Sequence, residues 1–158
     1  MTLVRPGFIL KTWRLLVKIP FGKAVFSFFI GQVAPYSGSI GFRTLFLEPG
    51  KAVVEMRDRR KVRNHLNSIH AMALVNLAEI ASGLAMMAGI PENARGIVRR
   101  FSIEYTKKAR GTITAKSEFD PPKDNIEREY EVDVVLRDLG GDIVATAKAC
   151  WLIGPLKE

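Results

Sequence analysis

The sequence predicts an α+β fold in which a six-stranded antiparallel sheet wraps one long central helix, with short helices at the N-terminal end. Two observations lead to this prediction. An almost wholly apolar segment, residues 69–88, lies between segments that alternate apolar and polar residues as strands do. A helix that is apolar on all sides must be buried, and a sheet with one apolar face can cover it. A chain of 158 residues has room for one such core.

The first 36 residues are expected to form an amphipathic helical segment, followed by a domain over residues 37–158. Apolar residues recur at helical spacing from Phe8 to Ile30, and Pro20 divides them into two short helices. Each helix is far shorter than the run of about 20 apolar residues that crosses a bilayer. Two roles are open for this segment. It covers a core edge or a subunit interface, or it rests on a membrane surface or hydrophobic ligand mouth with its basic face toward anions.

The elements of the main domain follow from alternation and turn signals. The central helix, residues 69–88, ends at a Gly-Ile-Pro signal. Glu-Pro-Gly at 48–50 and Asp-Leu-Gly-Gly at 138–141 predict hairpin turns between strands. Strands are expected over residues 39–47, 51–58, 97–108, 111–119, 129–137 and 142–152.

The charge of the chain is unevenly distributed. The 24 Lys and Arg residues exceed the 16 Asp and Glu residues, which gives a net charge of +8. Residues 1–47 carry six basic side chains and no acid, whereas ten acids and five basic residues follow from residue 117 onward. An excess of positive charge is typical of proteins that bind a phosphorylated small molecule, an anionic membrane or a nucleic acid. Nucleic acid is the least favoured partner, because the aromatic and glycine patterns of RNA-binding modules are missing.

Cys150 is the single cysteine of the chain, which excludes an intrachain disulfide and a multi-cysteine zinc site. Together with the lack of a cleavable signal, this predicts a reducing, cytoplasmic location. Cys150 itself is expected to be a core residue of the last strand.

Glu79 is the residue that most needs an explanation, because no Lys or Arg lies between Arg63 and Arg95. An ionised carboxylate in a buried apolar helix costs several kcal/mol unless it is paired, hydrogen-bonded or hydrated. Two explanations are open. Glu79 meets an arginine from a neighbouring strand, or it is a general base or nucleophile whose surroundings raise its pKa toward working pH.

His70 lies at the expected start of the same helix. Unpaired backbone N–H groups there could hold a developing oxyanion, although a simple polar cap is the alternative. His70 and Glu79 are nine residues apart, which places them on opposite faces and ~13 Å apart along the axis. They can share one site only if each comes from a different subunit, as in a two-fold dimer with adjacent antiparallel helices.

These residues also carry a family resemblance, through two runs: Asn64-His65-Leu66-Asn67-Ser68-Ile69-His70-Ala71-Met72 and Leu77-Ala78-Glu79. They resemble the hotdog-fold thioesterases of the phenylacetic-acid-degradation (PaaI-like) type. That family's pattern is an Asn, a His-Gly-Gly six residues later, and an Asp or Glu nine residues after the His. The similarity runs from about residue 39 to residue 152, and the chain with its Pro35-Tyr36 segment is similar to the bacterial DUF4442 branch. Residues 105–111 resemble the family's strand-turn-strand near the coenzyme A phosphates.

The resemblance implies a hotdog fold and an acyl-CoA thioesterase that acts as a homodimer, with a tetramer also open, and binds acyl-CoA between subunits. Glu79 would be the base or nucleophile, and Asn64 would orient the water or the acyl group. His70, with the backbone of Ala71 and Met72, would lie by the thioester oxygen. Ala71 and Met72 stand where the family has glycines. Their side chains limit how closely a ligand can approach the backbone, which glycine would allow.

Three basic residues, Lys107, Lys108 and Arg110, would meet the phosphates of coenzyme A on the same resemblance. Coenzyme A would enter as part of the substrate, with no metal or other cofactor.

A non-catalytic acyl-CoA or lipid-binding module on the same scaffold is the alternative function. The retained spacing of Asn64 and Glu79 favours the enzyme, whereas the missing glycines favour the binding module. A hotdog dehydratase would need a histidine base in a proline-rich loop, and nothing near His70 resembles one.

Overall fold

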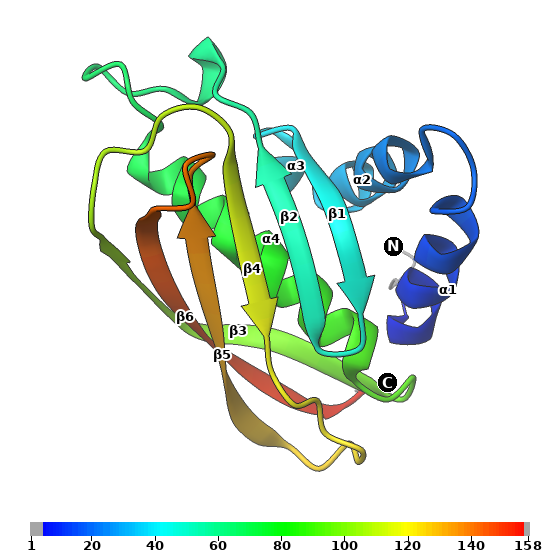
Figure 1. Ribbon diagram of the computed structural model, residues 1–158. Coiled ribbons are helices and arrows are strands. Elements are labelled where there is room, and N and C mark those ends of the chain that lie inside the picture. Colours follow the sequence, from blue (N-terminus) through cyan, green and yellow to red (C-terminus); the bar gives the residue numbers. More distant parts are fainter. Residues whose placement is uncertain (1–4, 157–158) are drawn as a thin grey trace.

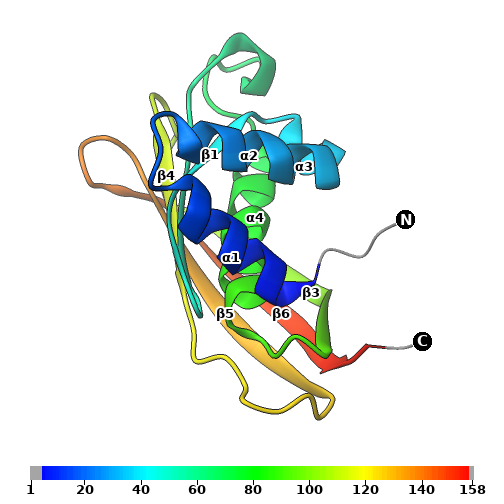
Figure 2. The same cartoon turned by 90° about the vertical axis from the view of Figure 1, so that its right-hand side faces the viewer.

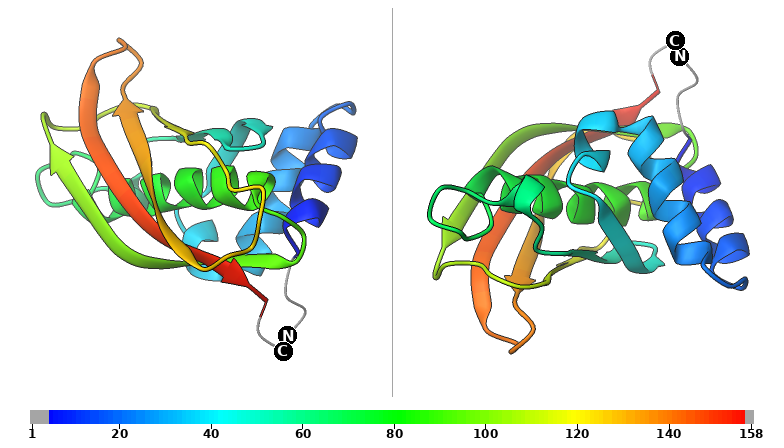
Figure 3. Two further views of the ribbon diagram at one scale, coloured as in Figure 1. Left: turned by 90° about the horizontal axis from the view of Figure 1, so that it is seen from below. Right: turned by 90° about the horizontal axis from the view of Figure 1, so that it is seen from above.

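The computed structural model describes residues 5–156, which form a six-stranded antiparallel sheet curled around one long helix, α4 (Ala71–Gly89; Figures 1 and 3). The order across the sheet is β1-β2-β4-β5-β6-β3, so β1 and β3 are its two edges. The predicted α+β fold is therefore confirmed. The strands are β1 (Phe42–Glu48), β2 (Lys51–Met56), β3 (Ala94–Tyr105), β4 (Ile113–Glu118), β5 (Arg128–Arg137) and β6 (Ile143–Pro155).

The helix α4 lies against the concave face of the sheet and forms the centre of the core. Its length and composition would suffice to cross a membrane, but 67% of the apolar stretch is buried inside the protein. The strands contribute alternate residues to the same core, as in β2, where Ala52, Val54 and Met56 are fully buried. α4 is thus the core helix that its uniformly apolar sequence predicts.

Three short helices precede the sheet: α1 (Pro6–Leu16), α2 (Gly22–Val33) and α3 (Pro35–Gly38). Figure 2 shows α1 and α2 side by side on the outside of the molecule, next to β1 and α4. Trp13 and Phe26 pack edge to face, with ring centroids 5.1 Å apart, and both belong to the hydrophobic cluster that surrounds α4. These helices therefore cover a core edge, which is one of the two roles that the sequence leaves open.

The predicted boundary between residues 36 and 37 stays a prediction, and the chain ends at 1–4 and 157–158 lie outside the described residues. A third short helix, α3, begins at Pro35. Pro favours the first position of a helix, since its fixed φ suits that position. The amide of Asn76 on α4 holds α3 in place by donating a hydrogen bond to the carbonyl oxygen of Tyr36 (3.3 Å).

The two edges of the sheet differ in whether another element covers them. At the β1 edge, Ser27 Oγ on α2 accepts a hydrogen bond from the backbone N–H of Thr44 (2.8 Å), and Lys23 Nζ donates to the carbonyl oxygen of Leu45 (2.8 Å). The long edge strand β3 pairs with β6 on one side and, within residues 5–156, with nothing on the other. Helix α2 therefore closes one edge by side-chain hydrogen bonds and leaves the other open for strand pairing.

We predict that Ser27→Ala lowers the free energy of unfolding by about 1–3 kcal/mol, because the buried N–H of Thr44 loses its acceptor. Urea denaturation of the two proteins measures this difference. Ser37→Ala serves as the control, since no hydrogen bond to the Ser37 side chain occurs in the described structure, and it should change stability by less than about 0.5 kcal/mol. An equal effect of both substitutions would contradict the role given to Ser27.

Candidate functional site

The sheet does not cover the whole circumference of α4. Residues at four-residue spacing along the helix stay only partly buried, and Glu79 is in the middle of this uncovered stripe. The stripe consists of Ala71, Val75, Glu79, Gly83 and Met87. The one acidic residue of α4 therefore lies on the side of the helix that a ligand or a second chain can reach.

Glu79 is largely buried and has no partner for its charge among residues 5–156. No hydrogen bond or ion pair reaches its carboxylate, so the arginine partner that the sequence left open as an explanation is not found. Burial in apolar surroundings raises the pKa of the Glu79 carboxyl. Any hydrogen-bond or ion-pair partner for the Glu79 carboxylate must therefore come from a ligand or a second chain that enters the uncovered stripe.

Gly83 is the neighbour of Glu79 on the uncovered stripe, and sequence reasoning missed it. A β-carbon at Gly83 would lie 3.5 Å from the indole of Trp151 and 4.0 Å from Glu79 Oε1. The indole is fixed because its Nε1–H donates to Ser82 Oγ (3.3 Å). The sequence did contain a signal for this contact. Gly83 follows Glu79, the one acid of an apolar helix, by four residues, and residues at this spacing share a face.

His70 is the N-cap of α4, as its place in the sequence predicts. Its Nδ1 accepts a hydrogen bond from the backbone N–H of Met72 (3.1 Å), so the proton of the neutral imidazole is on Nε2. The N–H of Ala71 has no acceptor in the described part of the chain. Of the backbone donors expected near a thioester oxygen, Ala71 is therefore available and Met72 is already used.

A hollow of about 260 Å³ lies at the start of α4 and brings together four of the predicted site residues: Asn64, Ala71, Lys107 and Lys108. Two contacts build it. The hydroxyl of Tyr105 donates to the carbonyl oxygen of Ala71 (3.2 Å), and the N–H of Ile69 donates to the carbonyl oxygen of Ala109 (2.9 Å). Tyr105, which was not among the predicted site residues, thus ties the end of β3 to the helix start.

Asn64 shapes the loop that forms one wall of this hollow. Its Oδ1 accepts hydrogen bonds from the N–H of Leu66 (2.9 Å), the N–H of Ser68 (3.3 Å) and the hydroxyl of Ser68 (3.2 Å). Such a side-chain turn fixes the local backbone. The Nδ2 amide group of Asn64 is left as the donor that could meet a ligand.

The three basic residues expected at the coenzyme A phosphates are not equivalent. Lys107 Nζ forms ion pairs with Asp138 (2.8 Å) and Asp142 (2.7 Å), and these hydrogen bonds, that to Asp138 foremost, raise its pKa. Lys108 and Arg110 are exposed and form no ion pair with another described residue. A phosphate would therefore meet Lys108 and Arg110 more readily than Lys107.

The hollow does not include Glu79. Glu79 is nine positions after the N-cap His70, so it lies about 13 Å along the axis from the helix start. Met72, seven residues before Glu79, projects on the same side of the helix as Glu79 and is 54% exposed. One chain therefore presents two half-sites: the helix start with its hollow, and the uncovered stripe with Glu79.

Other features of the described residues do not add to this site. No group of three or more His, Cys, Asp or Glu side chains that could hold a metal ion occurs in residues 5–156. Cys150 is buried in β6, its Sγ lies 3.2 Å from Glu129 Oε2, and burial raises the pKa of its thiol, as expected of a core cysteine. A larger hollow, of about 790 Å³, lies elsewhere, between α2 and the strands β1 and β2.

This sheet around one long helix, with Asn64, His70 and Glu79 at the expected spacing, is the hotdog fold found in thioesterase-family proteins. Within that class, the chain belongs to the family described as Domain of unknown function (DUF4442), whose model matches residues 22–153. The resemblance stated from the sequence is thus confirmed. No curated protein matches this chain.

Solved structures resemble the chain over most of its length. The crystal structure of the genomics target APC5556 is 32% identical, with a TM-score of 0.81, and the alignment covers 94% of this chain and 99% of that one. Pseudomonas aeruginosa PA5026, a protein of unknown function called a probable thioesterase, is 22% identical (TM-score 0.75; 87% and 97% covered). A thioesterase family protein from Silicibacter pomeroyi is 16% identical (TM-score 0.71; 87% and 100% covered).

We predict that Glu79→Gln stabilises the protein increasingly as the pH rises. The folded-state pKa of Glu79 is raised, so its contribution to stability is fully present below the unfolded value of about 4.3 and is lost as the pH rises through the folded value. The melting temperatures of the two proteins should therefore be similar near pH 4 and diverge in favour of Glu79→Gln by pH 8.

The control for this prediction is the exposed Glu48→Gln, which should show no such divergence. A lower melting temperature for Glu79→Gln near pH 8 would show that the Glu79 carboxylate has a stabilising cationic partner, contrary to the environment described above.

Proposed function

We propose that the protein is an acyl-CoA thioesterase in which Glu79 is the general base or the nucleophile, at a site completed by a second copy of the chain. The observation that carries this proposal is a largely buried carboxylate that has no cationic partner within residues 5–156 and lies on the side of α4 that the sheet leaves uncovered. A carboxylate whose pKa is raised toward neutrality is a better proton acceptor at working pH. Thioesterases among the solved structures with this fold support the choice of reaction.

In the general-base form of the reaction, Glu79 takes a proton from water and the resulting hydroxide attacks the thioester carbonyl carbon. The carbon–sulfur bond then breaks, and the coenzyme A thiolate takes the proton back from Glu79. In the nucleophilic form, the Glu79 carboxylate attacks the carbonyl carbon, the carbon–sulfur bond breaks, and the coenzyme A thiolate leaves a mixed anhydride behind. Water then hydrolyses the anhydride, which regenerates the Glu79 carboxylate and releases a proton that the thiolate takes up. Both forms end in a free carboxylic acid and a free thiol.

The negative oxygen of the tetrahedral intermediate needs hydrogen-bond donors. The start of α4 offers two that no described residue uses: the N–H of Ala71 and Nε2–H of His70. The positive end of the helix dipole adds to their effect. Since these donors are at the helix start, more than two turns away from Glu79 of the same chain, we propose that a second copy supplies them.

The open edge of the sheet supports such a dimer. Val98 on β3 lies opposite Trp151 on β6, and the indole of Trp151 lies next to Gly83, which neighbours Glu79 on α4. Ile97 and Val98 are exposed apolar residues on this unpaired edge strand. Edge-to-edge pairing of two β3 strands would cover these residues and bring a second α4 to the flank on which Glu79 lies.

For the coenzyme A part of the substrate, we propose that Lys108 and Arg110 bind the phosphates, close to the hollow at the helix start. Lys107 would have to exchange its two aspartate partners for a phosphate. In the structure these aspartates hold Lys107, and with it the loop after β3, against the β5–β6 turn.

One specific observation favours the alternative of a non-catalytic acyl-CoA or lipid-binding module. Met72 stands at a glycine position of the family pattern, its side chain is exposed at the helix start, and its N–H is already bonded to His70. A protein of this kind would bind acyl-CoA without releasing thiol.

The deciding experiment measures thiol release from a panel of acyl-CoA thioesters. We predict that Glu79→Gln lowers turnover by roughly 10²-fold or more, because a positioned acid–base group contributes on this scale, and that the substitution leaves the protein folded. The exposed Glu48→Gln is the matched control. Loss of stability with retained turnover per folded molecule would exclude Glu79, and a wild type that binds acyl-CoA without releasing thiol would support the binding module.

We predict that the protein is at least a dimer and that Val98→Asp shifts it toward monomer, since a charge would be buried at the paired β3 edge. Sedimentation velocity at micromolar concentration measures this shift. Ile126→Asp, at an exposed apolar position in the β4–β5 connection, should leave the assembly unchanged. A stable wild-type monomer would exclude the two-copy site.

A further inference from the structure

The N-terminal helices expose an apolar surface that their packing against the core does not use. Phe21 is 83% exposed, Leu15 70% and Phe28 69%, and Ile19 and Val25 are also exposed. These five residues, here called the N-terminal apolar surface, come from the end of α1, the α1–α2 turn and α2, the two helices that Figure 2 shows on the outside of the molecule. Isolated exposed apolar residues need no explanation, but five within the short stretch of residues 15–28 indicate a contact surface.

Phe21 has an additional feature. Its backbone is in the left-handed region, with φ +60°, directly before the first residue of α2. This conformation is unfavourable for a bulky residue. The turn therefore holds a large aromatic side chain outward in an unfavourable backbone geometry, and no fold contact accounts for it, since the ring is almost fully exposed.

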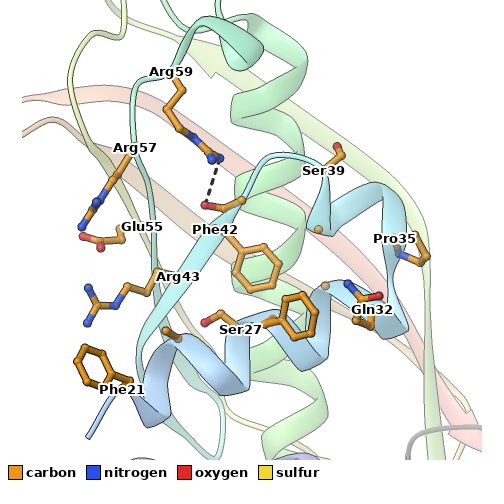
Figure 4. A pocket seen from close by; sticks show the side chains of 15 residues that line it. Phe21, Ser27, Gln32, Pro35, Ser39, Phe42, Arg43, Glu55, Arg57 and Arg59 are labelled. Atoms are coloured by element: carbon orange, nitrogen blue, oxygen red, sulfur yellow. Dashed lines mark hydrogen bonds between the residues drawn. The ribbon is translucent and has the colours of Figure 1, made fainter.

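A groove of about 790 Å³ borders this surface and combines aromatic and cationic walls. Figure 4 shows Phe21 beside Arg43, with Arg57 further along the same wall and Phe42 in the middle of the groove. Phe28 also lines it, from α2. The groove is outside the hotdog site, because it contains none of the predicted catalytic or substrate-binding residues.

Basic residues outnumber acidic ones around the surface. Every charged residue from position 5 to 47 is basic. Lys11 is paired with Glu92 and Lys23 is bonded to a backbone carbonyl, so these two are used within the fold. Arg14, Lys18 and Arg43 form no ion pair or side-chain hydrogen bond with any residue in the described range, and the same holds for Arg57, just after β2. Glu55 is the one acidic residue that lines the groove.

We propose that this face binds an anionic phospholipid membrane, with the N-terminal apolar surface inserted at the interface and Arg43 and Arg57 contacting lipid phosphates. An apolar surface flanked by unpaired cations matches the boundary between acyl chains and anionic headgroups. A second copy of this chain fits less well, since a two-fold contact would oppose the same cations. Membrane binding is independent of the proposed hydrolysis and is measured without it.

The test is co-sedimentation of the full protein with vesicles. The wild type should bind mixed phosphatidylglycerol–phosphatidylcholine vesicles about tenfold or more tightly than pure phosphatidylcholine vesicles. Raising the salt from about 0.1 M to about 0.5 M should weaken this binding, because the headgroup attraction is screened. Equal binding to both vesicle types, or binding to neither, would overturn the proposal.

Two double variants separate the apolar and charged contributions. Phe21→Ser/Phe28→Ser should weaken binding to anionic vesicles by about tenfold or more, through lost apolar burial. Arg43→Gln/Arg57→Gln should weaken it to a similar extent and reduce its salt dependence. Because all four side chains are exposed, both double variants should have the melting temperature of the wild type.

The matched controls are Leu139→Ser, at the β5–β6 turn and 79% exposed, and Lys116→Gln on β4. Both should bind vesicles as the wild type does. Equal weakening by the controls would show that the effect is general and overturn the proposal. A change in sedimentation coefficient of the double variants without lipid, with vesicle binding retained, would instead assign the surface to self-association.

Discussion

The burial of α4 by a sheet that cannot close around it is the constraint on which the rest of the structure depends. Twelve of the 19 residues of α4 are buried, as a helix with almost no polar residues requires. Six strands still leave one side of the helix partly open, and Glu79 and Gly83 lie there. On any other side of α4 the Glu79 carboxylate would be fully enclosed in apolar surroundings. The incomplete wrapping therefore makes a charged residue tolerable in this core and at the same time makes it accessible.

The start of α4 shows how local hydrogen bonds decide which groups remain for a ligand. His70 uses one ring nitrogen to cap the helix, and Asn64 uses its oxygen to build the preceding loop. Each keeps one donor free. Lys107 is held by two aspartates, whereas Lys108 next to it is not. Two neighbouring lysines therefore differ in availability: Lys107 is used to hold the local structure, whereas Lys108 is free to meet a ligand.

The core helix and all six strands could be predicted from the sequence, because each depends on a local pattern: an apolar run, alternation, or a hairpin turn. The position of His70 as N-cap followed in the same way. The partners of Lys107 could not be predicted, since Asp138 and Asp142 reach it only through the topology of β3, β5 and β6. The same holds for the Trp151 contact at Gly83 and for the groove between α2 and β2. Each depends on segments far apart in the chain that only the folded sheet brings together.

The hydrogen bond from Thr44 to Ser27 has a consequence for the size of any assembly. A sheet with two free edges can add copies at both ends, and such growth has no natural stop. Here α2 occupies the β1 edge, so only β3 can accept another strand. Pairing between two β3 edges uses both available edges at once and yields a closed, two-fold particle. Helix α2 thereby blocks the addition of further copies at the β1 edge. As long as α2 stays in place, edge-to-edge strand pairing cannot build a fibre.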